Sequence, residues 1–168
     1  MRSADLLGEA FDRIAQIVHW VVDDTPGQLL TFRADSAANS AAWLVWHLTR
    51  VQDDHIAEVA GRAQVWPAAG FADRFALPFE QDATGYGHSS VEVAAVPGDG
   101  RLLADYHDAV HEQTVAFVRT LDDEELERVV DTSWDPPVTL GARLISVVSD
   151  DLQHAGQAAY ARGLADRA

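Results

Sequence analysis

The stretch SDDLQHAGQ, residues 149–157, decides the fold prediction because it places two metal-ligand side chains within an otherwise apolar helix. Asp150 and His154 are four residues apart, so on a helix their side chains lie one turn apart on the same face. Both residue types bind divalent metals. Two such side chains close to a core predict a third partner on a facing helix.

Four segments have the 3.6-residue periodicity of helices that face a core. We predict long helices over residues 3–24, 40–61, 101–121 and 140–163. Four amphipathic helices predict an all-α four-helix bundle, with residues 1–168 as a single domain. The residues of the last helix predicted to point inward are Leu144, Ile145, Val148, Leu152, Ala155 and Ala159.

The connection between the second and third long helices, residues 62–100, lacks a sustained helical pattern. Its length favours a crossover rather than a hairpin, and a connection this long is typical of a functional segment or a lid. Short helices are expected at 72–75 and 90–95, and also at 28–30 in the earlier connection. Residues 129–139 are predicted to form a loop.

The composition excludes several classes of partner and reaction. The formal net charge of −15 argues against nucleic acids and anionic membranes, which bind positively charged surfaces. The sequence has no run of about 18 apolar residues, the length that would predict a membrane-spanning helix. The chain has no cysteine, which excludes disulfides, thiolate zinc sites and a cysteine nucleophile, and it has no lysine for Schiff-base chemistry. We therefore expect a cytoplasmic location.

His47 is the third candidate ligand. On the second long helix it lies between Trp43 and Val51, one turn from each, and so is expected to point into the bundle; Asp54 is two turns further on the same side. Arg50 and Asp53 are predicted to lie elsewhere around this helix.

His47, Asp150 and His154 together form a set of two histidines and one carboxylate. Such ligands suit zinc or nickel first, with manganese or iron(II) as alternatives. Three protein ligands leave a coordination position open for water or substrate, as in catalytic sites.

Two other interpretations of these residues stay open on spacing alone. Asp151 competes with Asp150 as the carboxylate ligand, or orients a ligand from outside the coordination sphere. Alternatively, there is no metal. A single inward histidine is more often a hydrogen-bonded core residue, and Asp150 with Asp151 is then a solvated acidic pair on an acidic protein.

The remaining histidines are weaker candidates. His107 and His111, four residues apart on the third long helix, are predicted to lie at the surface, with the mouth of a pocket as the alternative. His19 and His55 are expected to be packing or surface residues. His88 lies in the irregular crossover and reaches a site only if that segment folds over as a lid.

Two motifs resemble the DinB/YfiT-like superfamily of metal-dependent bundle proteins. Residues 39–48, ending in His47-Leu48, resemble its second-helix signature, and residues 150–157 resemble its last-helix HxxxHxGQ signature. The resemblance implies a four-helix fold over nearly the whole chain, with His47, Asp150 and His154 at the ligand positions. Many members have histidine where this chain has Asp150, and the maleylpyruvate isomerase branch has glutamate there.

The resemblance also implies thiol chemistry, because the superfamily includes mycothiol-dependent S-transferases and isomerases. A low-molecular-weight thiol such as mycothiol would be the cosubstrate, since the chain has no cysteine. The small-molecule pocket is then expected to draw on Trp43, Tyr86, His88, His107 and Trp134. Competing hypotheses are a metal-binding stress-response or sensor protein without turnover, and a purely structural or interaction bundle. A homodimer formed through an exposed helix face near Trp20 and Trp46 is one option.

Overall fold

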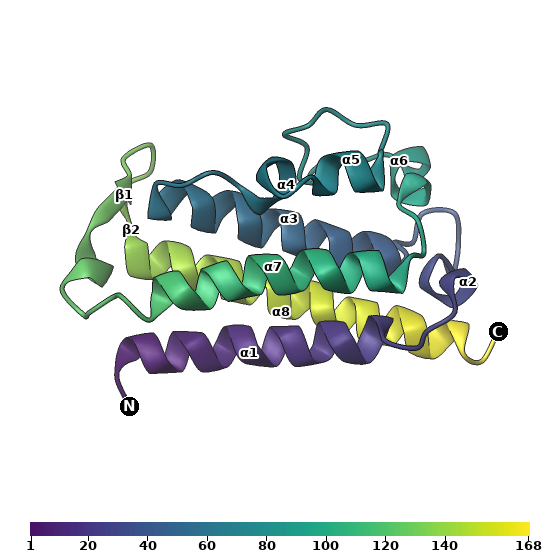
Figure 1. The fold of residues 1–168 in the computed structure, drawn as a ribbon, viewed down its shortest axis with the longest axis horizontal. Helices are drawn as coiled ribbons and strands as arrows, with labels where there is room; N and C mark the ends of the chain where they lie inside the picture. Colours follow the sequence, from purple (N-terminus) through teal and green to yellow (C-terminus); the bar gives the residue numbers. More distant parts are fainter.

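The computed structural model describes residues 1–168 and confirms the all-α bundle with its long crossover (Figure 1). Four long helices form the bundle: α1 (Ser3–Val22), α3 (Ala41–Ala60), α7 (Gly100–Val118) and α8 (Leu140–Ala165). Each packs on two neighbours, in the cyclic order α1–α7–α3–α8. Phe11, Ile14, Leu103 and Leu144 are among the buried residues of the core between them. None of the helices is long and apolar enough to cross a membrane.

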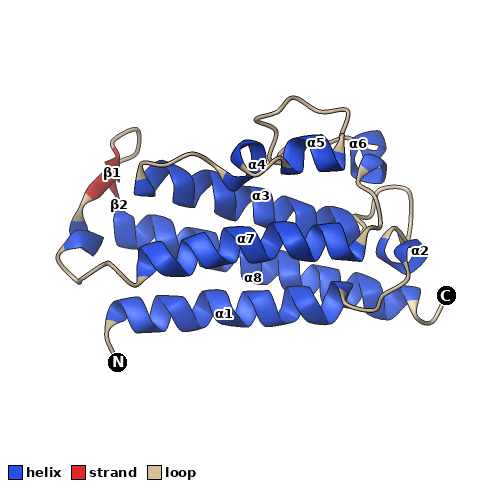
Figure 2. Ribbon diagram, viewed as in Figure 1, coloured by secondary structure: helices blue, strands red, loops and turns tan.

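The chain runs in one direction in α1 and α8 and in the opposite direction in α3 and α7 (Figure 1). Because α3 and α7 are adjacent and run the same way, the segment between them must return along the whole bundle. It does so over the outer side of α3, where it forms three short helices (Figure 2). These are α4 (Val65–Ala68), α5 (Phe71–Phe75) and α6 (Ser90–Ala95). The last two were predicted from the sequence, and α4 was not.

Local capping explains where three of the long helices begin and where α3 ends. The Ser40 hydroxyl accepts a hydrogen bond from the Trp43 amide at the start of α3, and Thr139 and Asp99 cap α8 and α7 in the same way. Gly61 ends α3 with a φ of 64°, the left-handed conformation that glycine adopts at little cost. The short α2 (Gly27–Leu30) follows α1, as predicted.

The predicted loop at 129–139 is a small hairpin. A 3₁₀ turn, η1 (Glu125–Glu127), leads into β1 (Val129–Asp131), which pairs antiparallel with β2 (Val138–Thr139) directly before α8 (Figure 2). The Arg143 guanidinium on α8 binds Asp131 at 3.0 Å and so fastens the hairpin to the bundle. Strands this short have too few residues to show a period of two in the sequence.

Predictions about which sides of α8 and α3 are buried are wrong at two places. Ile145 and Leu152 were expected to point inward, but they are 57% and 40% exposed. Arg50 and Asp53 were placed outside the buried side of α3, yet both are buried. The crossover covers that side of α3 and converts what would be a solvent-facing surface into an interior.

Arg50 and Asp53 form a polar network under the crossover. Asp53 accepts hydrogen bonds from the Val65 and Trp66 amides, each at 2.8 Å, and from the Tyr106 hydroxyl at 2.9 Å. The Arg50 guanidinium lies 3.6 Å from the same carboxylate and donates to the Ala83 carbonyl at 3.1 Å. The network therefore connects α3 with α7 and with the crossover at residues 65, 66 and 83.

Candidate metal centre and its pocket

His47 is held in one orientation by the crossover and by its own helix. Its Nδ1 lies 2.5 Å from the Thr84 carbonyl oxygen, which only accepts, so Nδ1 carries the proton. The ring stacks on Trp43 with centroids 4.7 Å apart. This tautomer leaves Nε2 with a free lone pair, the form in which histidine binds metals.

The two α8 residues are arranged in a similar way. His154 Nδ1 lies 2.9 Å from the Gln157 side-chain oxygen, which accepts a hydrogen bond from the Nδ1–H group, so Nε2 carries the free lone pair. His154 Nε2 lies 3.6 Å from Asp150 Oδ1. The second oxygen, Asp150 Oδ2, is buried and has no hydrogen-bond partner. Gln157, the last residue of the motif at 150–157, therefore fixes the tautomer and orientation of the His154 ring.

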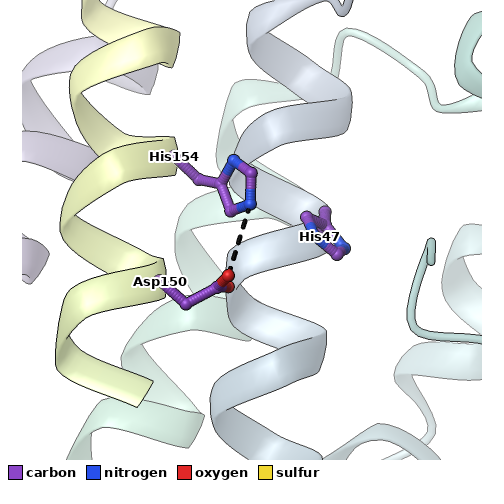
Figure 3. Close-up of side chains that lie close together, drawn as sticks. All are labelled: His47, Asp150 and His154. Carbon is purple, nitrogen blue, oxygen red and sulfur yellow. Dashed lines mark ion pairs between the residues drawn. The ribbon is translucent and has the colours of Figure 1, made fainter. Parts of the chain in front are cut away.

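α3 and α8 are adjacent, and they bring His47, Asp150 and His154 together (Figure 3). One ligand atom from each residue lies within 4.8 Å of the others. The two imidazole rings meet edge to face with centroids 4.7 Å apart. Ligand atoms about 2.1 Å from one zinc ion would lie about 3.4 Å from each other, so small side-chain rotations are sufficient. Two free Nε2 atoms and an unpartnered buried carboxylate oxygen fit a divalent cation.

The protonation state of His47 also suits a metal. Burial lowers the pKa of His47 below its ordinary value, and the nearby His154 contributes in the same direction. The hydrogen bond to Thr84 and the charge of Asp150 oppose this shift without reversing it. His47 is therefore neutral at neutral pH, as a metal ligand must be.

Asp151, the competing carboxylate, lies apart from this cluster. It is fully buried, and neither of its oxygens has a hydrogen-bond partner. Burial, followed by the charge of Asp150, raises the pKa of Asp151 well above its usual range. The geometry therefore favours Asp150 over Asp151 as the group that faces the two histidines.

The crossover approaches His47 so closely that residue 85 must be glycine. Gly85 has a φ of 104°, and a Cβ at this position would lie 2.7 Å from His47 Nδ1. The same Cβ would lie 3.1 Å from both Trp43 and Trp46. The close approach places the neighbouring Thr84 carbonyl against the imidazole.

A pocket of about 420 Å³ opens beside the cluster, along the groove between α3 and α8. Besides His47 and Asp150, it is lined by Val51, Asp54, His55, Thr84, Tyr86, Ser146 and Val147. Of the five pocket residues expected from the sequence, Tyr86 alone lines it. Asp54 and Ser146 were not predicted as pocket residues, although helical spacing places them two turns from His47 and one turn from Asp150.

The other predicted pocket residues lie elsewhere. His88 accepts a hydrogen bond from the Trp43 indole at 3.2 Å and stacks on Trp46, so it packs behind the cluster. His107 was expected at the surface but is fully buried, with Nδ1 3.2 Å from the Thr49 hydroxyl. Burial lowers the pKa of His107 to about 3, which keeps it neutral. Trp134 is exposed in the hairpin loop.

His19 and His111 contact carboxylates away from the pocket. His19 Nε2 lies 2.7 Å from Asp108, and its Nδ1 lies 3.0 Å from Asp23. His111 Nε2 lies 2.9 Å from Asp12. None of these pairs touches the cluster of His47, Asp150 and His154.

Comparison with known proteins agrees with this architecture. The family model described as mycothiol S-transferase matches residues 6–167. A crystal structure of a conserved protein from Enterococcus faecalis superimposes with a TM-score of 0.92 and 28% sequence identity, over 100% of this chain and 99% of that one. No curated protein matches the chain. Because the family model spans nearly the whole sequence, the chain belongs to the mycothiol S-transferase family, within the DinB/YfiT-like group that its motifs resemble.

Proposed function

We propose that this protein is a cytoplasmic, divalent-metal-dependent enzyme that transfers a low-molecular-weight thiol to an electrophilic small molecule. The observation that carries the proposal is the convergence of His47, Asp150 and His154, with both Nε2 atoms free, at the end of an open pocket. The family match supports mycothiol as the thiol. Since the chain has no cysteine, the reacting sulfur must come from the cosubstrate.

In this proposal, His47, Asp150 and His154 hold one divalent ion, zinc or nickel in the first place, with manganese or iron as alternatives. When bound, such an ion lowers the pKa of a coordinating thiol and so supplies a thiolate nucleophile. Thr84 and Gln157 keep the two imidazoles in the ligand tautomer. The pocket holds the electrophile next to the sulfur, and Gly85 allows the crossover to shield one side from water.

We expect the zinc- or nickel-loaded protein to conjugate mycothiol with 1-chloro-2,4-dinitrobenzene. The sulfur forms a bond to the ring carbon, the carbon–chlorine bond breaks, chloride leaves, and the thiol proton passes to the buffer. Conjugate formation is followed by absorbance, with His154→Ala as the inactive variant. His19→Ala, which alters a surface ion pair, should keep wild-type activity.

A metal-loaded protein that forms no conjugate with mycothiol, glutathione or 2-mercaptoethanol would contradict the transferase proposal. The same metal site would then serve the alternative function, a metal-binding stress-response or interaction protein without turnover.

We also propose a homodimer, formed through an apolar face on α1 and α8. Leu6, Trp20 and Ile145 on this face are 61%, 58% and 57% exposed. Its residues recur at alternating spacings of three and four, the pattern of packed helix seams. They are Leu6, Ala10, Arg13, Ile17 and Trp20 on α1, and Ala142, Ile145, Ser149, Leu152, Gly156 and Ala159 on α8. Trp46, the other predicted contact residue, is buried in the core.

Two adjacent helices about 30 Å long present about 600 Å² of surface, so two copies would bury about 1,200 Å², the lower end for a stable interface. We therefore expect Ile145→Asp to convert a wild-type dimer into a monomer, as measured by light scattering after gel filtration. Ala116→Asp, on the exposed side of α7, is the matched control and should stay dimeric. A wild-type protein that is monomeric at all concentrations would contradict the proposal.

A further inference from the structure

Asp54 presents a fixed hydrogen-bond acceptor to the pocket. Its Oδ1 accepts a hydrogen bond from the Gln64 amide nitrogen at 2.7 Å. The Gln64 oxygen in turn accepts from the buried Arg50 guanidinium at 2.9 Å. This chain of contacts holds the carboxylate in place, while Oδ2 makes no hydrogen bond within the protein and is available to a ligand.

His55, the next residue, presents a donor. Its Nδ1 lies 3.4 Å from the Arg143 guanidinium, and because arginine only donates, Nδ1 must be the acceptor. The neutral ring therefore carries its proton on Nε2. Arg143 is itself held by Asp131 of the hairpin at 3.0 Å. An acceptor and a donor thus line the same pocket. The carboxylate is held by Gln64, which is bound in turn to buried Arg50, and the imidazole is held by half-buried Arg143.

The pocket is lined by acidic side chains and by no arginine. Asp54 and Asp150 both line it, whereas no arginine side chain does. The chain as a whole carries a formal charge of −15. Asp150 and a thiolate would together offset the two positive charges of an ion at the cluster, which leaves Asp54 as the net negative charge of the loaded pocket. A ligand with free carboxylates would meet the like charge of Asp54, while a neutral ligand would not. Hydroxyl groups both donate and accept, so neighbouring hydroxyls on a sugar or cyclitol ring match the pair of Asp54 and His55.

We propose that Asp54 and His55 are specificity-determining residues, which bind the hydroxyl groups of a neutral polyhydroxylated thiol and disfavour thiols that carry carboxylates. This inference rests on the proposed thiol-transfer function and assigns the recognition step within it. The pocket volume of about 420 Å³ is adequate for a ligand of this class. Tyr86, 95% exposed at the pocket rim, offers an aromatic face on which a sugar ring can stack.

The test titrates the cobalt-loaded protein with three thiols and follows the sulfur-to-cobalt absorption band. Mycothiol is the neutral polyol, 2-mercaptoethanol is a neutral thiol without a ring, and glutathione is the anion. We expect wild-type protein to bind mycothiol most tightly and glutathione most weakly. Loss of a hydrogen bond to a charged group predicts that Asp54→Ala weakens mycothiol binding by about 10- to 100-fold and leaves 2-mercaptoethanol unchanged.

Two further variants separate recognition from a merely structural role. Asp54→Asn keeps an acceptor oxygen but removes the charge, so it should reduce the preference for mycothiol over glutathione by strengthening glutathione binding. Glu58→Ala, one turn along α3 and exposed, is the control and should behave as wild type. Circular dichroism and cobalt content verify that each variant is folded and loaded.

The outcomes distinguish the two proposals. If 2-mercaptoethanol and mycothiol bind wild-type protein equally, or if Asp54→Ala weakens all three thiols to the same degree, the assignment of Asp54 and His55 is wrong and thiol binding stands. If no thiol produces the absorption band in loaded wild-type protein, the thiol-transfer proposal fails, and the recognition proposal fails with it.

Discussion

His154→Ala protein should bind zinc at least about 100-fold more weakly than the wild type, because one of three protein ligands is lost. His47→Ala should have the same effect, since the hydrogen bond from Nδ1 to Thr84 leaves its Nε2 as the atom that α3 would contribute to the proposed site. Competition with a chromophoric chelator measures the affinity, and elemental analysis of protein purified without a metal-affinity tag measures the bound ion. Unchanged zinc affinity in both variants would show that these histidines are core residues rather than ligands.

Matched variants make this result specific to the site. His19→Ala removes a histidine from a surface ion pair and should leave metal binding unchanged. Gln157→Ala keeps His47, Asp150 and His154 but removes the acceptor of the hydrogen bond from His154 Nδ1. We therefore expect it to weaken zinc binding by about 10- to 100-fold, less than His154→Ala does. Asp150→Asn compared with Asp151→Asn tests which carboxylate faces the ion.

Asp53→Ala should destabilise the fold by about 3–5 kcal/mol, the cost of leaving a buried charge without its partner. The substitution strands the Arg50 guanidinium, which is fully buried, and removes the acceptor of two backbone amides at the start of α4. Burial raises the pKa of Asp53, while these amides, Tyr106 and Arg50 favour the ionised carboxylate. Urea unfolding followed by circular dichroism gives the change in the free energy of unfolding.

Asp105→Ala is the control for this experiment. Asp105 pairs with Arg74 at 2.8 Å, but both side chains are more than 40% exposed, so the pair contributes about 0–1 kcal/mol. A destabilisation by Asp53→Ala no larger than that of Asp105→Ala would mean that the network under the crossover contributes little to stability.

The long helices could be predicted from the sequence because their signals are local. Ser40 and Gly61 mark the ends of α3, and apolar periodicity marks its length. The clustering of His47, Asp150 and His154 was predictable for a similar reason: Asp150 and His154 are related by one helical turn, and His47 lies on the apolar side of its own helix. Bringing the two helices together required only the bundle itself, which places α3 against α8.

The failures concern contacts between distant segments. Asp53 is buried because residues 65 and 66 return to cover it, and no local pattern encodes that return. His107 is buried against Thr49 of another helix. Ile145 and Leu152 have the spacing of core residues but lie on the exposed α1/α8 face, because a row of exposed apolar side chains has the same helical periodicity as a core.

The antiparallel pairing of α3 with α8 has a consequence for the folding of a chain that cannot form disulfides. An ion held by His47, Asp150 and His154 would cross-link two points about 100 residues apart, enclosing the crossover, α7 and the hairpin in one loop. Because the unfolded chain does not hold these three side chains together, the ion would bind the folded bundle alone and stabilise it by mass action. The occupied site would thus act as a reversible cross-link between α3 and α8, so that the free energy of unfolding of the bundle depends on the concentration of free metal.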